Sequence, residues 1–391
     1  MMTKRSIFHF SLTAMMIISL LTATNAGAAD LDVPRPPGTN AQAASLIDVT
    51  SGRILYSHHG DAEMPVASLT KIMTAIVAIE HGKLNEVVSV SKNAYRKEGS
   101  SIYLELGEEM TLENMLYGLM LRSGNDAATA IAEHVGGSEE GFVHLMNEKV
   151  KMLGLKHTQF QNPHGLDAKG HYSSANDLAV ITAYSLQNSV FKEIVKTPSK
   201  KAPNPNNPWD YKWDNKNKML HFYEGADGVK TGYTKIARRC LVSSATRAGQ
   251  QLAVVTLNDG DDWNDHQKLL DYGFAHYPLK EIIETGQSVQ NELVTGSGFS
   301  YALATGELER IERKLYVQKA RANDFGYRGQ IKITLDGQEI GQVPVYEQGS
   351  FIPKPEPAKG NWRSTPSLSA WRNNGWGNTF AAVMRSLLFA D

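Results

Sequence analysis

Apolar residues recur at two different periods along this chain, and the change of period divides it. Over residues 65–81 they fall at intervals of three and four, which predicts a helix with one buried face. The same period covers 111–121, is interrupted at 123–125 and resumes over 127–135, before Gly136-Gly137. The first half of the chain therefore carries a helical block.

Strand patterns lie on both sides of this block. Residues 45–49 and 53–56 flank a Thr-Ser-Gly turn and predict a hairpin. Segments 228–232, 241–244 and 252–257 predict consecutive antiparallel strands, and a helix follows through Leu269, Leu270 and Phe274. Strands from both ends with helices between them predict an α+β domain in which the two ends share one sheet.

The helical period disappears after Pro278. Residues 331–335 and 338–346 alternate on either side of an Asp-Gly turn, which predicts a β-hairpin. We expect a small β domain over 279–352 and a linker rich in Pro, Ser and Gly over 353–368.

The last stretch, 369–391, carries apolar residues at helical spacing and predicts an amphipathic helix on the membrane surface. Packing of this helix on the β domain is the alternative. Its apolar positions are Trp376, Phe380, Val383, Met384, Leu387 and Leu388.

The first 28 residues have the pattern of a signal peptide. Lys4 and Arg5 precede an apolar run, and the small residues of 26–29 follow it. We expect cleavage after Ala28 or Ala29, a catalytic domain over 29–278, and a mature protein on the outer face of the cytoplasmic membrane or in the cell wall.

Charge and cysteine content exclude other classes. The formal net charge of −1 argues against a nucleic-acid partner, which requires a basic surface. Cys240 is the only cysteine, so no intrachain disulfide can form, and its apolar neighbours predict a buried thiol. No cofactor and no metal site are expected.

Three motifs in a fixed order carry the chemistry: S-x-x-K at Ser68–Lys71, S-G-N at Ser123–Asn125 and K-T-G at Lys230–Gly232. S-x-x-K occurs three times, also at 89–92 and 189–192, but only the first copy lies upstream of the other two motifs.

Serine is a weak nucleophile at neutral pH and needs a base beside it. Positions i and i+3 share a helix face, so Lys71 can place its amine against the Ser68 hydroxyl. The amine must be neutral to accept a proton, and we expect burial and the nearby cation Lys230 to lower its pKa. Ser123 can relay the proton, Asn125 can hold a substrate amide, and Gly232 leaves room for a peptide along its strand.

With these residues, the chain resembles the serine-type D-alanyl-D-alanine carboxypeptidases, the low-molecular-mass penicillin-binding proteins of peptidase family S11. The likeness covers residue 44 to about 277. Within the family the chain is most similar to the sporulation-type enzymes of endospore-forming bacteria. The matching runs are 98–104, 121–128, 162–167 and 228–234, and the finer placement rests on 230–235 and 258–266.

The resemblance implies a penicillin-binding, transpeptidase-like fold and an acyl-enzyme on Ser68 that releases the terminal D-alanine of a peptidoglycan stem peptide. β-Lactam antibiotics would acylate the same serine, and the activity would limit cross-linking in cell wall or spore cortex. The backbone N–H groups of Ser68 and Tyr233 would form the oxyanion hole. Thr231 would bind the terminal carboxylate, with Lys71 as base, Ser123 as relay, and Asn125, Lys230 and Gly232 lining the site.

Some family members carry a basic residue late in the domain that helps to bind the substrate carboxylate. Here that region, 261–263, is acidic. Arg238 and Arg239 are candidates to replace it, and solvated charges at a strand edge are the alternative.

Four other functions are weighed against this one. A class A β-lactamase needs S-D-N and a downstream glutamate, whereas this chain has Gly124 and no such glutamate motif. A D,D-endopeptidase or transpeptidase on the same fold stays open. A wall-binding protein with a vestigial site is the alternative from another class, and the intact motif set argues against it. A metallopeptidase built on His157, His164 and His171 is disfavoured, because spacings of seven do not match H-E-x-x-H.

Overall fold

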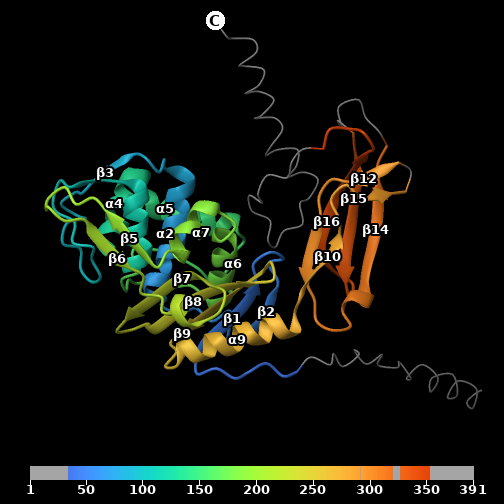
Figure 1. Ribbon diagram of the computed structural model, residues 1–391, viewed down its shortest axis with the longest axis horizontal. Coiled ribbons are helices and arrows are strands. Elements are labelled where there is room, and N and C mark those ends of the chain that lie inside the picture. The colour runs from blue at the N-terminus through green and yellow to red at the C-terminus, as the bar shows by residue number, and fades with distance from the viewer. Residues whose placement is uncertain (1–33, 291, 320–325, 353–391) are drawn as a thin grey trace, which may run out of the picture. The chain divides into compact units, whose positions relative to one another are not determined.

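The computed structural model describes residues 34–290, 292–319 and 326–352 (Figure 1). The predicted signal peptide, linker and amphipathic tail lie outside the described residues. None of the helices in the described ranges is long and apolar enough to cross a membrane.

A five-stranded antiparallel sheet organises the first part of the chain, in the order β2-β1-β9-β8-β7. β1 pairs with both β2 and β9, so the strands from the two ends of the domain share one sheet, as predicted. The strands are β1 (Ala43–Asp48), β2 (Ile54–His58), β7 (Ala226–Thr234), β8 (Arg238–Arg247) and β9 (Gln250–Leu257).

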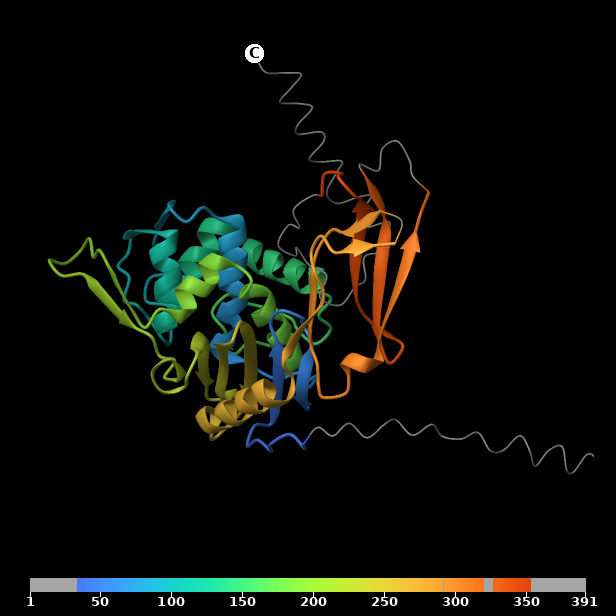
Figure 2. The ribbon, with the colours of Figure 1, turned by 45° about the vertical axis from the view of Figure 1, so that its right-hand side comes forward.

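Helices cover both faces of this sheet. Figures 1 and 2 show α9 (Asp262–His276) on one face and the cluster of helices around α2 on the opposite one. The central helix α2 is buried along most of its length, as its apolar spacing requires. The cluster opposite α9 consists of α2 (Thr70–His81), α3 (Leu112–Tyr117), α4 (Asn125–Gly136), α5 (Glu139–Met152), α6 (Ala175–Ser185) and α7 (Ser189–Lys196).

The helix predicted from residue 65 begins later. A 3-10 turn, η1 (Ala67–Leu69), precedes α2, because Ala67 adopts a positive φ of 47° that a continuous α-helix does not allow. The helix predicted over 111–121 also divides, into α3 and the π-helical turn η2 (Gly118–Arg122). Gly137 ends α4 in the left-handed conformation, as expected.

Short elements complete this part, and the sequence pattern did not predict most of them. They are the paired strands β3 (Val87–Ser89) and β4 (Glu109–Thr111), the paired strands β5 (Ser199–Ala202) and β6 (Tyr211–Asp214), and the short helix α8 (Met219–Phe222).

The chain after residue 278 forms a separate β structure. Its five-stranded sheet has the order β11-β12-β16-β15-β14, and the predicted hairpin is β15–β16, with Asp336 and Gly337 both at positive φ. The strands are β10 (Leu279–Ile283), paired with β13 (Phe299–Ala302), and β11 (Ser288–Val289), β12 (Leu293–Thr295), β14 (Ile311–Val317), β15 (Tyr327–Leu335) and β16 (Gln338–Glu347). The turn η3 (Leu308–Arg310) precedes β14.

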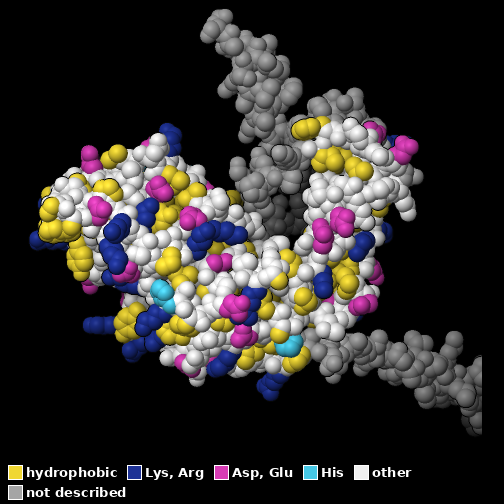
Figure 3. Space-filling model, viewed as in Figure 1, with side chains coloured by type: hydrophobic (Ala, Val, Ile, Leu, Met, Phe, Trp, Pro, Cys, Tyr) yellow, Lys and Arg dark blue, Asp and Glu magenta, His cyan; other side chains and the backbone are white. Residues whose placement is uncertain are grey.

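Cys240 is buried, as predicted, and burial raises the pKa of its thiol to about 12. On the face shown in Figure 3, acidic and basic side chains are intermingled rather than gathered by sign.

Candidate active site

Ser68 lies in the turn that introduces α2, and Lys71 lies in the first turn of that helix. The Lys71 side chain is completely buried, and its Nζ is 3.1 Å from the Ser68 Oγ. The S-x-x-K spacing therefore places the amine against the hydroxyl, as the helical geometry predicted.

Two further oxygens fix the orientation of the amine. Lys71 Nζ donates to Asn125 Oδ1 at 2.6 Å and to the backbone carbonyl of His164 at 2.5 Å. Both of these oxygens can only accept. A neutral amine has two N–H bonds and one lone pair, so its lone pair then faces the Ser68 hydroxyl. Lys71 is held in the geometry of a base for Ser68.

The pKa of Lys71 is suited to this role. Burial, with a smaller contribution from the positive charge of Lys216, lowers it to about 7, although Asp126 acts in the opposite direction. Burial also lowers the pKa of Lys230 well below its usual value, and the charges of Lys71 and Lys216 add to the effect. The sequence predicted Lys230 as the cation that lowers the pKa of Lys71. The cation that lowers it is Lys216, which the sequence did not single out and which also lowers the pKa of Lys230.

The S-G-N motif lies on the side of the site where Asn125 contacts Lys71. Ser123 ends η2 with a φ of +66°, and its buried hydroxyl has no hydrogen-bond partner among the described residues. A buried hydroxyl without a partner in a cleft is available to a substrate. Asn125 uses both side-chain atoms, since its Nδ2 donates to the Glu98 carbonyl at 2.6 Å while its Oδ1 accepts from Lys71.

Asp126, which the sequence analysis did not assign, holds the loop that Asn125 contacts. Its buried carboxylate accepts from the backbone N–H groups of Ile102 and Leu104 and from the Ser101 hydroxyl at 2.6 Å. The loop over 98–104 is thereby fixed against the start of α4.

The K-T-G motif lies on β7, directly beside the nucleophile. A Cβ added at Gly232 would lie 3.3 Å from the Ser68 backbone nitrogen and 3.3 Å from the Ala67 Cβ. Glycine therefore allows the strand to approach η1 closely. The next residue, Tyr233, is 61% exposed, and Lys230 is buried and donates to the Thr231 carbonyl at 2.7 Å.

The loop 162–167 orients a backbone carbonyl toward Lys71. The sequence identified this loop only as a run that resembles the family. The side chain of Asn162 accepts from the backbone N–H groups of His164 and Gly165, which orients the His164 carbonyl toward Lys71. An Asn whose side chain accepts from the backbone N–H groups two and three residues later is typical of a turn. Asn162 was therefore the feature of the sequence that could have indicated this turn.

Gly165 is needed in that loop for two reasons. Its φ is +81°, and an added Cβ would lie 2.0 Å from the Ala67 carbonyl oxygen. The loop therefore packs directly against the turn that carries Ser68.

The arginine candidates differ from each other. Arg239 forms a two-pronged ion pair with Asp262, with Nε 3.1 Å from Oδ2, so it is engaged within the protein. Arg238 is exposed at the first position of β8, a strand that lies between β7 and β9. Lys216 is exposed above the site, with its Nζ 3.3 Å from the Ser100 Oγ.

The three histidines considered for a metal site have separate partners. His157 lies 3.6 Å from Glu63, His164 lies 3.5 Å from Glu139, and His171 contacts Thr70. In the described ranges no three His, Cys, Asp or Glu side chains gather in a group that could hold a metal ion.

Comparison with known proteins relates this geometry to one family. The family model described as D-alanyl-D-alanine carboxypeptidase, peptidase S11, matches residues 31–261. The chain is 34% identical over 382 residues to the D-alanyl-D-alanine carboxypeptidase DacF of Bacillus subtilis, covering 90% of this chain and 97% of that protein. It is 32% identical to DacA of Escherichia coli, over 90% and 95% of the two chains.

Solved structures agree with this relationship. The fold matches penicillin binding protein 5 from Haemophilus influenzae with a TM-score of 0.67 and 27% identity, covering 81% of this chain and 98% of the other. The Streptomyces K15 DD-transpeptidase matches with a TM-score of 0.58 and 32% identity, over 62% of this chain and 99% of the other.

Proposed function

The chain belongs to peptidase family S11, the serine-type D-alanyl-D-alanine carboxypeptidases that act on peptidoglycan, and from this membership we propose a role for each residue of the site. The observation that carries the proposal is the Lys71 amine, 3.1 Å from Ser68 Oγ and oriented by two carbonyl oxygens.

In the acylation step Ser68 Oγ attacks the carbonyl carbon between the two terminal D-alanines, and its proton passes to Lys71 Nζ. The C–N bond then breaks, and the leaving amine takes a proton through the Ser123 hydroxyl. The backbone N–H groups of Ser68 and Tyr233 stabilise the oxyanion, since β7 approaches η1 closely at Gly232. The products are free D-alanine and an ester on Ser68.

Water then hydrolyses the ester. Lys71, neutral again after the first proton has left with the leaving amine, accepts the proton of the attacking water, and Ser68 is restored. β-Lactams acylate Ser68 in the same way, and slow hydrolysis of that ester makes them inhibitors.

The terminal carboxylate of the substrate requires hydrogen-bond donors and a cation. We assign the Thr231 hydroxyl as a donor and Lys216 as the cation, because Lys216 lies close enough to lower the pKa of both site lysines. Lys230 and Asn125 complete the polar wall. Asn125 releases part of its present hydrogen bonding when a substrate amide arrives.

A fluorescent penicillin tests the assignment of Ser68. We expect wild type to form a covalent adduct and to release D-alanine from a stem pentapeptide, and Ser68→Ala to do neither, with a loss of at least about a thousandfold. Ser189→Ala, in another S-x-x-K sequence, is the matched control and should label normally. A folded wild type that does not label would leave a vestigial, wall-binding protein.

Transfer of the acyl group to an amine is the second candidate reaction, because the chain is similar to a DD-transpeptidase at 32% identity. Product analysis with an added acceptor amine separates the two reactions. A carboxypeptidase gives mainly the hydrolysed tetrapeptide, whereas a transpeptidase gives the amide.

For the whole chain we propose an exported enzyme divided into a signal peptide (1–28), a catalytic domain (29–278), a β domain (279–352), a linker (353–368) and a membrane-associating tail (369–391). Deleting the chain from Pro366 onward should move an active enzyme from the membrane to the soluble fraction. The runs 230–235 and 258–266 support a sporulation-type enzyme of cell wall or spore cortex.

A further inference from the structure

Two backbone segments hold the oxygens that orient the Lys71 amine. One oxygen is the His164 carbonyl itself. The other is Asn125 Oδ1, and the amide that carries it is fixed by its bond to the Glu98 carbonyl. Neither His164 nor Glu98 lies in a helix or strand. Each segment therefore needs a further contact to hold its carbonyl in place.

The buried ring of His164 provides such a contact for the first segment. Its Nδ1 accepts from the backbone N–H of Leu166 at 3.3 Å, so in the neutral ring Nε2 carries the proton. Nε2 lies 3.5 Å from Oε1 of Glu139, which is in the first turn of α5. Burial lowers the pKa of the His164 ring, which is therefore neutral at pH 7 and directs an N–H toward the carboxylate.

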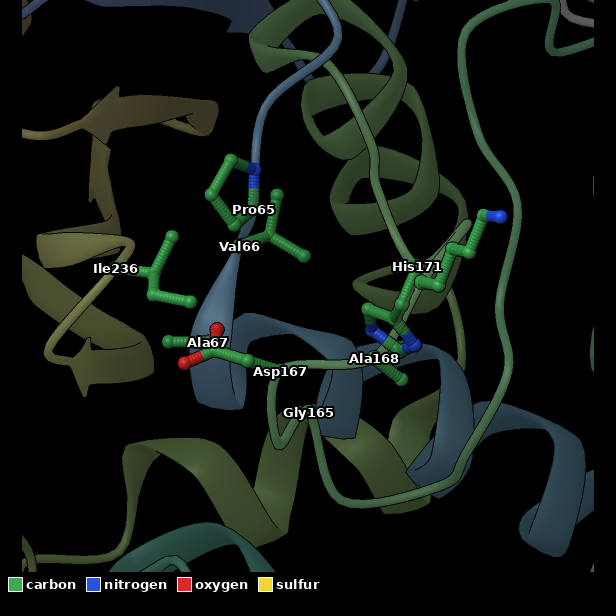
Figure 4. Close-up of a pocket in the computed structure, with 9 residues that line it drawn as sticks. Pro65, Val66, Ala67, Gly165, Asp167, Ala168, His171 and Ile236 are labelled. Carbon is green, nitrogen blue, oxygen red and sulfur yellow. The ribbon is translucent and has the colours of Figure 1, made fainter.

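The loop that follows His164 is held on another side by the turn before Ser68. Figure 4 shows Gly165 and Asp167 beside Ala67, where they line a cavity of about 340 Å³. The loop thus has two supports, the turn at Ala67 and the carboxylate of Glu139.

The second oxygen of the same carboxylate reaches the other segment. Glu139 Oε2 accepts from Lys97 Nζ at 3.1 Å and from Asn93 Nδ2 at 3.2 Å. The side chains of Lys97 and Glu139 are only 20% and 18% exposed, so water screens this ion pair weakly. Lys97 directly precedes Glu98, whose carbonyl fixes the Asn125 amide. One carboxylate therefore anchors both segments.

The charge of this carboxylate is secure. The contact with His164, followed by the contact with Lys97, lowers the pKa of Glu139 to about 2, against the effect of burial. The group is ionised at neutral pH and accepts at both oxygens. A neutral amide in its place would present an N–H to one of its two donors.

We propose that Glu139 is a positioning residue for the acyl-transfer reaction. It acts through His164 with one oxygen and through Lys97 with the other, and so directs the lone pair of Lys71 toward Ser68. In the described residues Glu139 has no hydrogen bond or ion pair with Lys71 or Ser68, so its effect passes through the two segments. The inference rests on the function proposed above, because Lys71 is the base in that mechanism.

The kinetics of labelling with a fluorescent penicillin test this role. Rates are expressed per acylable site, from titration to full labelling, so that an unfolded fraction does not count. Glu139→Gln should lower the limiting acylation rate by at least about tenfold, because a misplacement of about 1 Å in a reacting group costs up to about a hundredfold. The penicillin concentration that gives half of the limiting rate should change by less than about twofold, because the lost interaction orients the base and does not bind the ligand.

Three further variants locate the effect. Glu140→Gln is the matched control, since Glu140 is exposed in the same first turn of α5 and shares the field of that helix. It should acylate at the wild-type rate. Lys97→Met should lower the rate by less than Glu139→Gln does, and should add little to it in the double variant. Glu139→Asp, which keeps the charge on a shorter side chain, should recover part of the rate.

Each outcome either supports or overturns the proposal. An acylation rate of Glu139→Gln close to that of wild type overturns it, as does an equal loss in Glu140→Gln. A loss confined to the half-saturating concentration would assign Glu139 to binding instead. If the losses in Lys97→Met and Glu139→Gln are fully additive, the common anchor is wrong. Lys71→Gln that acylates at the wild-type rate would overturn the proposed base, and this inference with it.

Discussion

The catalytic region and the β structure over 279–352 bury very different side chains. Around Ser68 the interior holds the two amines of Lys71 and Lys230 and the carboxylate of Asp126, each at most 1% exposed. The core of the β structure is an aliphatic cluster that includes Ile333, Val343 and Val345. Ionised groups are expensive to bury, so a fold keeps them where they are used.

The difference shows where this protein gives up stability for function. Buried amines, a Ser123 hydroxyl that has no hydrogen-bond partner in the described ranges, and Ala67 at positive φ gather around the nucleophile. The β15–β16 hairpin instead alternates buried and half-buried residues and pairs its charges on the surface, as Lys332 does with Glu339 at 2.5 Å. Acid, backbone and core changes should therefore affect the two regions differently.

Acid should produce the largest difference in stability between the catalytic region and the β structure. His266 is completely buried between Ser243 and Thr256, and burial lowers its pKa to about 3 from an ordinary 6.5. The unfolded chain binds the proton below about pH 6.5, whereas the native protein stays neutral down to about pH 3. Stability should therefore fall as the pH drops through this window, by up to about 5 kcal/mol at its acid end.

Urea unfolding at pH 7, 5 and 4 measures this effect, with His266→Gln as the variant whose dependence should be flatter. Residues 279–352 contain no histidine. Hydrogen exchange resolved by segment should accordingly show β8, β9 and α9 opening before β15 and β16 as the pH falls. Simultaneous opening of both regions would contradict the predicted difference in their acid stability.

A matched pair of glycines tests the backbone of the two regions. Gly165 and Gly337 both have positive φ, but an added Cβ meets the Ala67 carbonyl at Gly165 and nothing within 4 Å at Gly337. Gly165→Ala should displace the His164 carbonyl from Lys71 and lower kcat/KM by about a hundredfold or more. Gly337→Ala should cost about 1 kcal/mol of stability and leave activity unchanged. Comparable activities in the two purified, folded variants would show that the loop 162–167 does not position the base.

Removal of core volume from the β structure should affect stability without affecting chemistry. Ile333→Ala should lower the free energy of unfolding by about 3 kcal/mol, since the side chain is fully buried. The adduct with fluorescent penicillin should form at the wild-type rate below the unfolding temperature, because the hydrogen bonds that hold Lys71 against Ser68 in the described ranges involve no residue beyond 278. A slower labelling reaction in folded Ile333→Ala would show that the core of the β structure influences the active site.

The smallest effect concerns the charge that Lys216 adds at the site. The rate of penicillin acylation should rise with pH around the Lys71 pKa of about 7. Lys216→Gln removes a cation that lowers this pKa, so the rising limb should move to higher pH by less than one unit, more at low ionic strength. Lys218→Gln, also exposed and two residues away, is the control. If the pH dependence of the acylation rate shifts equally in both variants, the effect comes from the net charge of the protein and not from Lys216 in particular.

Much of the site was predictable because its motifs obey local geometry. The pairing of Ser68 with Lys71 follows from their spacing on a helix. The shared sheet, the three strands from β7 to β9 and the β15–β16 hairpin follow from the periods of apolar residues. The late start of α2, at Ala67 with its positive φ, and the π-helical turn at 118–122 do not follow from the periods of apolar residues, whereas the interruption at 123–125 does.

What the sequence determined by itself was the family of chemistry: a serine with a lysine one turn later, a strand that contains the glycine of K-T-G, and two periods of apolar residues. The tertiary structure decided which distant groups complete the site. The His164 carbonyl and the charge of Lys216 act on Lys71 from 93 and 145 residues further along the chain, with no shared period to reveal them. Local spacing is set by covalent geometry, whereas the lone-pair direction and the pKa of Lys71 depend on burial and on partners that only folding brings together.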